Sequence, residues 1–150
     1  SWDDNARFLF LSKDRLDDNK VKTLYVNLYG KVQVRSVSNE DVYKYLNASD
    51  FGILFRDDVI MNNVASPSKF AEYVLCGLPT IISKGVGDFS ELCEQEKLGI
   101  VVENFNLSVF DKNKLLNNVF DRNLIADFGK KTLSKQSQLN IIISQFKQFL

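Results

Sequence analysis

Five short apolar runs, each long enough for one β-strand, alternate with segments of helical periodicity along the first two thirds of the chain. The runs are residues 7–12, 32–37, 51–55, 80–83 and 100–102. The helical patterns lie at residues 21–28, 38–46, 66–77 and 89–97. Strands that alternate with helices over short connections are typical of a parallel sheet covered by helices. We therefore expect an α/β fold with a Rossmann-like parallel sheet flanked by helices.

The last third of the chain has a different pattern. From residue 109 onward, apolar side chains recur at helical spacing and no strand-like run appears. Three apolar groups lie within residues 115–120, 124–128 and 139–150. This spacing predicts a helical C-terminal segment. A terminal helix of this kind usually packs in the core, and the alternative is that its end braces a partner domain.

The segment 66–77 contains the clearest start and stop signals for a helix. Ser66 is a preferred N-cap residue, and Pro67 suits the first helical position because its missing N–H is not needed there. At the other end, Gly77 can adopt the left-handed conformation, and Pro79 prevents the helix from continuing. The sequence therefore predicts a short helix bounded by these residues.

The first turn of this helix contains a charge that its position disfavours. Lys69 lies where the helix dipole is positive, so a structural role alone would favour Asp or Glu. An anion held by the amides of Ser68 and Lys69 and by the ammonium group would remove this conflict. Glu72 follows one turn later on the same face, where a carboxylate suits sugar hydroxyls. The alternative is a solvated Lys69–Glu72 pair worth only about 0.2–0.5 kcal/mol.

Composition and charge exclude several classes of function. The chain has 150 residues, of which 45% are hydrophobic and 25% charged, so we expect one soluble globular domain over residues 1–150. Nineteen basic and nineteen acidic residues balance, and no basic tract occurs, so general nucleic-acid binding is not expected. Histidine is absent, which excludes every mechanism that needs this chain to supply a histidine base or ligand.

The cysteines and the hydropathy pattern indicate a cytoplasmic protein. Cys76 and Cys93 are far apart and belong to no metal-binding pattern, so we expect both to be reduced and to serve as small buried side chains. No apolar run approaches the ~18 residues of a membrane span, and the first residues lack the features of a signal peptide. The chain starts abruptly at a residue other than Met, so we expect a fragment of a longer protein.

Two loops follow strand candidates, at the place where α/β proteins usually bind ligands. The first, residues 56–65, begins with Arg56, which could assist phosphate binding. It also contains Asp57 and Asp58, but two adjacent carboxylates on a loop do not specify a metal site, and we expect no metal. The second, residues 84–87, contains Gly85 and Gly87, which allow close approach of the backbone to a ligand. Asp88 and Glu91 then predict a capping box for a helix over 89–97.

Three stretches of this sequence resemble one enzyme family. The stretches are "EDVYKYLNASDFGILF", "ASPSKFAEYVLCGLPTIIS" and "GVGDFSELCEQEKLGIVV". They look like the carboxyl-terminal, donor-binding half of a retaining glycosyltransferase of family 4, which has the two-domain GT-B fold. The resemblance rests on the pattern Ser-Pro-x-Lys-x-x-Glu-Tyr followed by Cys-Gly-x-Pro. It covers about the central two fifths of the chain well, and the rest by the order of elements.

This resemblance implies a role for each residue of the pattern. Lys69 would contact the diphosphate of a nucleotide sugar and stabilise the leaving group, and Glu72 would accept hydrogen bonds from the ribose. Ser66 and Ser68 at the helix start would support the phosphates. Val37 and Ser38, at a strand end, are candidates for contacting the base through their backbone. Gly85, Gly87 and Asp88 would line the sugar side.

The sequence also departs from the family pattern. The commoner motif has a first glutamate at the position of Val64, so the role of that glutamate is not carried over, and the residue that performs catalysis is not identified. A further Gly-Arg and Lys-Gly pattern for the diphosphate is absent, and so is the acceptor-binding amino-terminal half. The fragment alone is therefore expected to be inactive.

The expected reaction of the full-length protein is sugar transfer from a nucleotide-diphosphate sugar to a carbohydrate or lipid-linked acceptor, in glycan or polysaccharide synthesis. No cofactor and no obligatory metal are expected, since the nucleotide sugar is the substrate. The expected partners are the missing domain and the acceptor, and the missing half would allow peripheral association with the inner face of the membrane. The alternatives are a nucleotide-sugar epimerase of the same architecture and a non-catalytic α/β interaction module.

Overall fold

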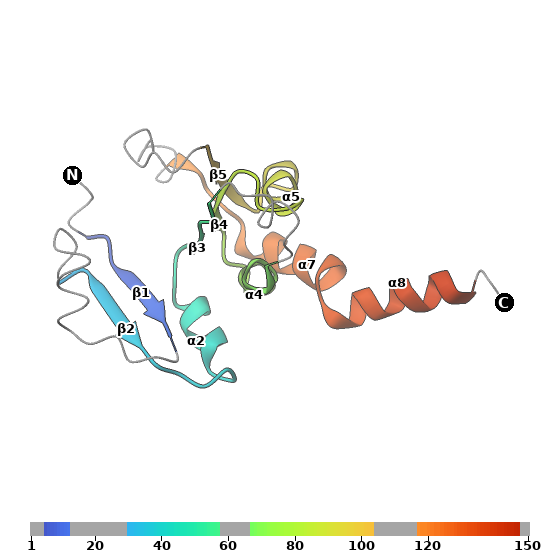
Figure 1. The fold of residues 1–150 in the computed structure, drawn as a ribbon, viewed down its shortest axis with the longest axis horizontal. Coiled ribbons are helices and arrows are strands. Elements are labelled where there is room, and N and C mark those ends of the chain that lie inside the picture. The colour runs from blue at the N-terminus through green and yellow to red at the C-terminus, as the bar shows by residue number, and fades with distance from the viewer. Residues whose placement is uncertain (1–4, 13–29, 58–66, 104–116, 148–150) are drawn as a thin grey trace. The chain divides into compact units, whose positions relative to one another are not determined.

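A computed structural model describes residues 5–12, 30–57, 67–103 and 117–147 of this chain (Figure 1). Contacts divide the chain into two compact units, Ser1–Lys44 and Tyr45–Leu150, and each is described by itself. The helical pattern predicted at residues 21–28 and the first apolar group of the C-terminal third, up to residue 116, lie outside the described residues.

The first unit contains a parallel pair of strands. Strand β1 (Phe8–Leu11) pairs with β2 (Val32–Arg35), with Phe8 opposite Val32. These strands confirm the runs predicted at 7–12 and 32–37, although β2 ends before Val37. A turn over residues 38–41 leads into helix α2 (Val42–Asn47), which crosses the boundary between the units.

The second unit is built from two successive strand–helix–strand crossovers. Strands β3 (Gly52–Leu54), β4 (Thr80–Ser83) and β5 (Gly99–Val102) are parallel and lie in the order β3-β4-β5. Helix α4 (Ser68–Leu75) connects β3 to β4, and α5 (Phe89–Gln95) connects β4 to β5. Every residue of the central strand β4 is buried, as expected for a parallel strand covered on both faces. The α/β, Rossmann-like fold predicted from the sequence is confirmed.

The core of the second unit lies between the sheet and its helices. It is formed by apolar side chains from the strands, from α4 and α5, and from helix α7 (Arg122–Thr132). Its buried members are Leu54, Phe70, Val74, Ile82, Val86, Cys93, Leu98 and Ile125. The rings of Phe70 and Phe89 join α4 to the start of α5, with centroids 5.1 Å apart. Helix α4 is therefore held on the sheet by its apolar face, which leaves its other face exposed.

The predicted end of α4 is confirmed, and its predicted start is wrong by one position. Gly77 has φ +65°, and the bonds from Gly77 N–H to the Val74 carbonyl and from Leu78 N–H to the Tyr73 carbonyl close the helix. Pro67 has φ −73° and ψ 115°, which is extended rather than helical, so Pro67 is the N-cap and the helix begins at Ser68. Ser66, predicted as the N-cap, lies outside the described residues.

Helix α5 also differs in detail from its prediction. Asp88 occupies the N-cap position, but its side chain makes no capping hydrogen bond because its backbone is already helical, at φ −76° and ψ −6°. The helix ends at Gln95 rather than at residue 97, because Lys97 takes the left-handed conformation with φ +54°. The bond from Leu98 N–H to the Cys93 carbonyl then closes the helix.

In the described residues of the C-terminal part, helices α7 and α8 (Lys135–Lys147) confirm the predicted helical segment. Helix α7 packs against α4, where Cα of Gly129 allows the two backbones to approach closely. Helix α8 has no buried residue, so the expectation that its apolar side chains pack in the core is wrong. Periodicity identified the helix, but it cannot show whether another element faces it. Among the described residues, no helix has the length and hydrophobicity that crossing a membrane requires.

Candidate functional site

The N-terminus of α4 lies toward the carboxyl edge of the sheet of the second unit. The helix ends just before the amino end of β4, so its axis runs antiparallel to the strands. Its 8 residues span about 12 Å, close to the length of a four-residue strand. The first turn is therefore level with the ends of the strands, where α/β proteins bind their ligands.

The first turn of α4 combines an exposed cation with a helix start that no acidic residue balances. Pro67 has no side-chain oxygen to accept from the first amides, and the turn contains no Asp or Glu. Ser68 and Lys69 are exposed, whereas Phe70 is buried and its N–H bonds to the Pro67 carbonyl. The dipole of the helix and the Lys69 ammonium therefore act in the same sense and favour an anion.

Lys69 and Glu72 are both exposed, and they do not pair with each other in the part of the chain that is described. Two other pairs with the same spacing do form, Asp41 with Lys44 at 2.7 Å and Asp127 with Lys130 at 3.3 Å. In both pairs the acid precedes the lysine in the chain, which is the more favourable order on a helix. Lys69 precedes Glu72, so the arrangement leaves both side chains available to a ligand.

A buried serine organises the segment that follows β3. The Oγ of Ser83, the last residue of β4, accepts a hydrogen bond from the Arg56 N–H at 2.9 Å and donates one to the Arg56 carbonyl at 3.0 Å. Ser83 is 4% exposed, and Arg56 is partly buried. Arg56, predicted to assist phosphate binding, is therefore fixed at the carboxyl edge of the sheet through its backbone.

The loop after β4 is organised in a similar way. The Gly85 N–H donates to the Oγ of the buried Ser90 at 3.2 Å. Gly85 and Gly87 have φ values of +79° and +49°, which side chains other than hydrogen rarely allow. Both glycines lie after the carboxyl end of β4, where they were predicted to line the sugar side. The structure therefore brings the segments of Arg56 and Gly85 to one edge.

An exposed ion pair connects the ends of β4 and β5. Lys84 Nζ lies 2.6 Å from Glu103 Oε1. The hydrogen bond and the charge of Glu103 raise the pKa of Lys84, and the same interactions lower the pKa of Glu103. Because both side chains are exposed, solvent screens the pair and its contribution to stability is small. Lys84 therefore has an ion-pair partner, whereas Lys69 does not pair with Glu72.

Two predicted site residues do not belong to the second unit. Val37 and Ser38 belong to the first unit, just after β2. The Ser38 hydroxyl donates to Asp41 Oδ2 at 2.9 Å. The hydrogen bond from Lys44 and then that from Ser38 lower the pKa of Asp41. The predicted contact between a nucleotide base and the backbone of Val37 and Ser38 stays a prediction.

Sequence reasoning missed Ser83 and Ser90 as residues that organise the site. The only local signal is that Ser83 is a polar residue at the end of an otherwise apolar strand, immediately before Lys84 and Gly85. Its partner Arg56 is 27 residues away in the sequence, so no local pattern could identify the hydrogen bonds. These contacts depend on the pairing of β3 with β4.

Neither metal-ligand clusters nor reactive thiols are found among the described residues. No group of three or more His, Cys, Asp or Glu side chains in that part of the chain could hold a metal ion. Cys76 and Cys93 are both free thiols. Burial raises the pKa of Cys76, and it raises the pKa of Cys93 to about 12, so Cys93 is a neutral core side chain at physiological pH.

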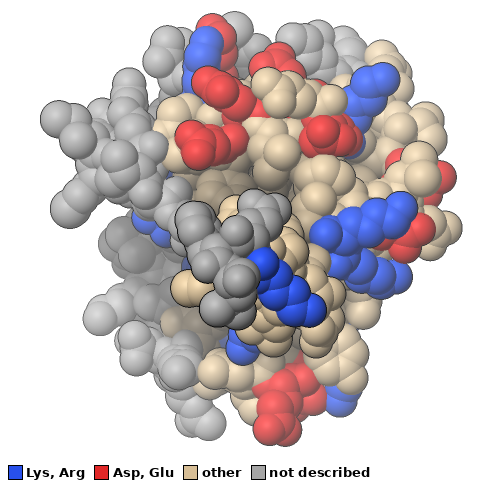
Figure 2. Space-filling model, turned by 90° about the vertical axis from the view of Figure 1, so that its right-hand side faces the viewer, with Lys and Arg blue, Asp and Glu red and all other residues tan. Residues whose placement is uncertain are grey.

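The net charge of the chain provides no general attraction for anions. Figure 2 shows one face of the molecule, on which Lys and Arg side chains lie among Asp and Glu side chains. The formal net charge of the chain is zero. Attraction of a phosphate must therefore come from local groups such as Lys69 and the helix start rather than from the overall charge. Comparisons with protein-family models, curated proteins and solved structures found no match to this chain.

Proposed function

We propose that this chain binds a nucleotide-diphosphate sugar at the N-terminus of α4, as the donor-binding domain of a retaining glycosyltransferase of the GT-B type. The observation that carries the proposal is the exposed, mutually unpaired combination of Lys69 and Glu72 on one helix face. A cation at a helix start favours a diphosphate, and a carboxylate one turn further suits the two hydroxyls of a ribose. The position of α4 at the carboxyl edge of a parallel sheet supports the same assignment.

The residues of this site would act mainly on the leaving group. In sugar transfer, the bond between the anomeric carbon and the diphosphate oxygen breaks, and its electron pair stays on the diphosphate. A new bond forms to the hydroxyl oxygen of the acceptor, and the proton of this hydroxyl passes to the departing diphosphate oxygen. Lys69 and the amides at the start of α4 would stabilise the negative charge that develops on the diphosphate. Glu72 would hold the ribose and so fix the position of the donor.

The acceptor would be a carbohydrate or a lipid-linked sugar, bound by a second domain that closes over the donor. The reaction therefore needs both domains, and this chain alone is expected to bind the nucleotide without transferring the sugar. No obligatory metal is part of the proposal, because Lys69 and the helix amides would neutralise the diphosphate.

Calorimetric titration with UDP, GDP and inorganic pyrophosphate tests the proposal. Lys69→Ala should weaken binding of all the ligands that wild type binds, by roughly tenfold or more, since a charge-assisted hydrogen bond contributes about 1.5–3 kcal/mol. Glu72→Ala should weaken binding of the nucleotide but leave binding of pyrophosphate unchanged, because pyrophosphate has no ribose.

Matched controls are available on other helices of the same unit. Lys135 is an exposed lysine at the first position of α8, and Glu94 is an exposed glutamate within α5. Lys135→Ala and Glu94→Ala should bind nucleotide as the wild type does. The proposal is wrong if the folded wild-type chain binds neither UDP nor GDP, or if Lys69→Ala and Glu72→Ala bind as tightly as the two control variants.

A further inference from the structure

The backbone of Arg56 is held by a side chain instead of by the strand ladder. The paired register of β3 and β4 ends with Leu54 opposite Ile82. Beyond this point the chain leaves β3, and the hydroxyl of Ser83 bonds to both the N–H and the carbonyl of Arg56. The Ser83 hydroxyl therefore satisfies both backbone hydrogen-bonding groups of Arg56, as the backbone of a neighbouring strand would. It also fixes the direction in which the chain leaves the sheet.

The location of these hydrogen bonds connects them with the candidate site. They lie at the carboxyl edge of the sheet, where ligands of parallel α/β sheets are bound. Ser83 is 4% exposed, so water competes little for its hydroxyl. A second buried hydroxyl, that of Ser90, holds the Gly85 N–H in the loop after β4. Two connections at this edge are thus held in place by side chains of the neighbouring elements before any ligand binds.

We infer that Ser83 is a positioning residue, which acts through the backbone of Arg56 and holds its guanidinium for a diphosphate. This inference rests on the proposed function, and it adds a second cation and the residue that orients it. An arginine can contact two phosphate oxygens at once through its planar guanidinium. A backbone that is held at both its N–H and its carbonyl reduces the range of positions that the guanidinium can reach. Arg56, just after β3, and Lys69, in the first turn of α4, would then bind the diphosphate together.

The inference is tested by a double-mutant cycle on UDP or GDP binding, with the complete 150-residue chain. Arg56→Ala should weaken binding by roughly tenfold, and Ser83→Ala should weaken it by a similar factor. If Ser83 acts through Arg56, the double variant should bind no more weakly than Arg56→Ala alone. A purely structural role of Ser83 would instead give effects on binding that multiply.

A second pair of variants separates the hydroxyl from the shape of the side chain. Ser83→Thr and Ser83→Val are nearly the same size, and only threonine keeps the hydroxyl. We expect the threonine variant to bind the nucleotide several-fold more tightly than the valine variant at equal thermal stability. This comparison remains valid if Ser83→Ala does not fold.

Thr80→Val is the matched control within the same strand. Thr80 is fully buried at the amino end of β4, and its hydroxyl lies 3.5 Å from the Leu78 carbonyl. Loss of this hydroxyl should not change nucleotide binding. The inference is wrong if Thr80→Val weakens binding as much as Ser83→Ala, if Arg56→Ala binds like the wild type, or if the double variant is additive. In each of these cases a loss of binding in Lys69→Ala still supports the proposed function, whereas no binding by the wild type contradicts that function itself.

Discussion

At the scale of single residues, the packing of β5 against β4 requires a glycine at position 99, because a side chain there would not fit. A Cβ added to Gly99 would collide with the carbonyl oxygen of Thr80, and it would lie 2.6 Å from the Thr80 nitrogen. Both contacts are to the backbone of the central strand, which cannot move without breaking its pairing with β5. We expect Gly99→Ala to lower the free energy of unfolding by about 3 kcal/mol, as measured by urea denaturation.

Gly30 is the control for this prediction, because it separates steric from conformational cost. It has φ +85°, and none of the described residues has an atom within 4 Å of an added Cβ. Gly30→Ala should therefore cost only the ~1–2 kcal/mol of a left-handed non-glycine residue. An equal loss of stability in the two variants would contradict the steric explanation for Gly99.

The two candidate ligand-binding residues of α4 could be predicted at this scale, whereas the residue that organises Arg56 could not. Lys69 is conspicuous in the sequence because it conflicts with a local rule about helix dipoles. Ser83 conflicts with no rule, and a serine at the end of a strand has many ordinary explanations. Its two hydrogen bonds to Arg56 become visible only when β3 and β4 are paired.

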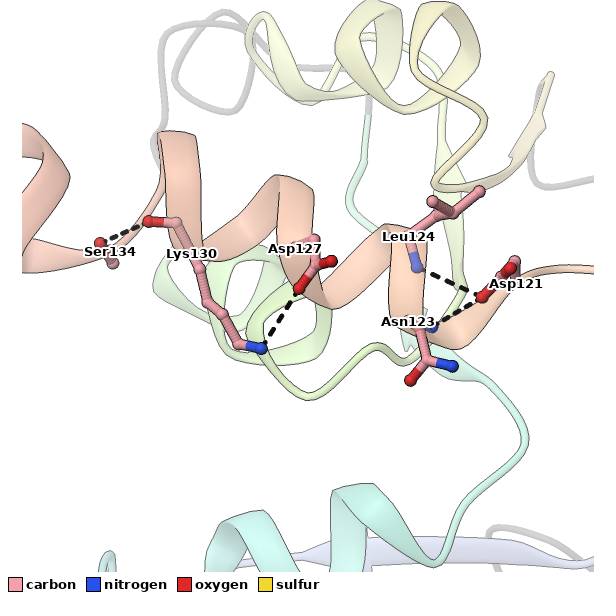
Figure 3. A network of polar contacts seen from close by, with 6 residues as sticks. All are labelled: Asp121, Asn123, Leu124, Asp127, Lys130 and Ser134. Carbon is pink, nitrogen blue, oxygen red and sulfur yellow. Dashed lines mark hydrogen bonds and ion pairs between the residues drawn. The ribbon is translucent and has the colours of Figure 1, made fainter.

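At the scale of elements, helix α7 has an N-cap side chain that accepts hydrogen bonds, whereas the N-cap residues of α4 and α5 make no such bond. The Oδ1 of Asp121 accepts from the N–H groups of Asn123 at 2.9 Å and Leu124 at 3.2 Å (Figure 3). Asp121→Ala should therefore destabilise the chain by about 1 kcal/mol. Thermal or urea unfolding measures this change.

Another aspartate of α7 provides the control. Asp127 pairs with Lys130 at 3.3 Å on the exposed surface, where such a pair contributes little (Figure 3). Asp127→Ala should lower the free energy of unfolding by no more than about 0.5 kcal/mol. A larger loss for Asp127→Ala than for Asp121→Ala would show that the cap does not stabilise α7.

The helix ends also show which elements could be predicted locally. The end of α4 follows from Gly77 and Pro79, because both restrict the backbone by their own covalent structure. The end of α5 does not, since Lys97 takes a left-handed conformation that its side chain disfavours. The two residues after Lys97 are closely packed, because Leu98 is buried in the core and Gly99 lies against the backbone of Thr80. Tertiary packing therefore overrides local preference at that position.

At the scale of the whole molecule, burial differs strongly between the two sheets. All four residues of β4 are buried, and the strand has a paired neighbour on each side. The residues of β1 and β2 are partly or fully exposed, and these strands pair only with each other among the described strands. Native-state hydrogen exchange should therefore be slowest at the amides of β4 and faster at those of β1 and β2.

Hydrogen exchange followed by NMR or mass spectrometry gives the opening free energy of each strand. We expect the amides of β4 to exchange only on global unfolding of the second unit. Protection of β1 as strong as that of β4 would contradict this prediction and would indicate that further parts of the chain cover the first sheet. Exchange within β3 and β5 should lie between these extremes, because each contains buried residues, unlike β1 and β2, but pairs with only one strand in the described part of the chain.

The sequence by itself determined the order of strands and helices, because strand and helix periodicities differ and each is encoded within a few residues. It also determined that α4 begins with a cation which its dipole disfavours. Only the tertiary structure decided that Lys69 does not pair with Glu72, that the apolar side chains of α8 are not buried, and that Ser83 holds the backbone of Arg56. The physical reason is that these outcomes depend on neighbours brought together by folding, which a local pattern of side chains does not specify.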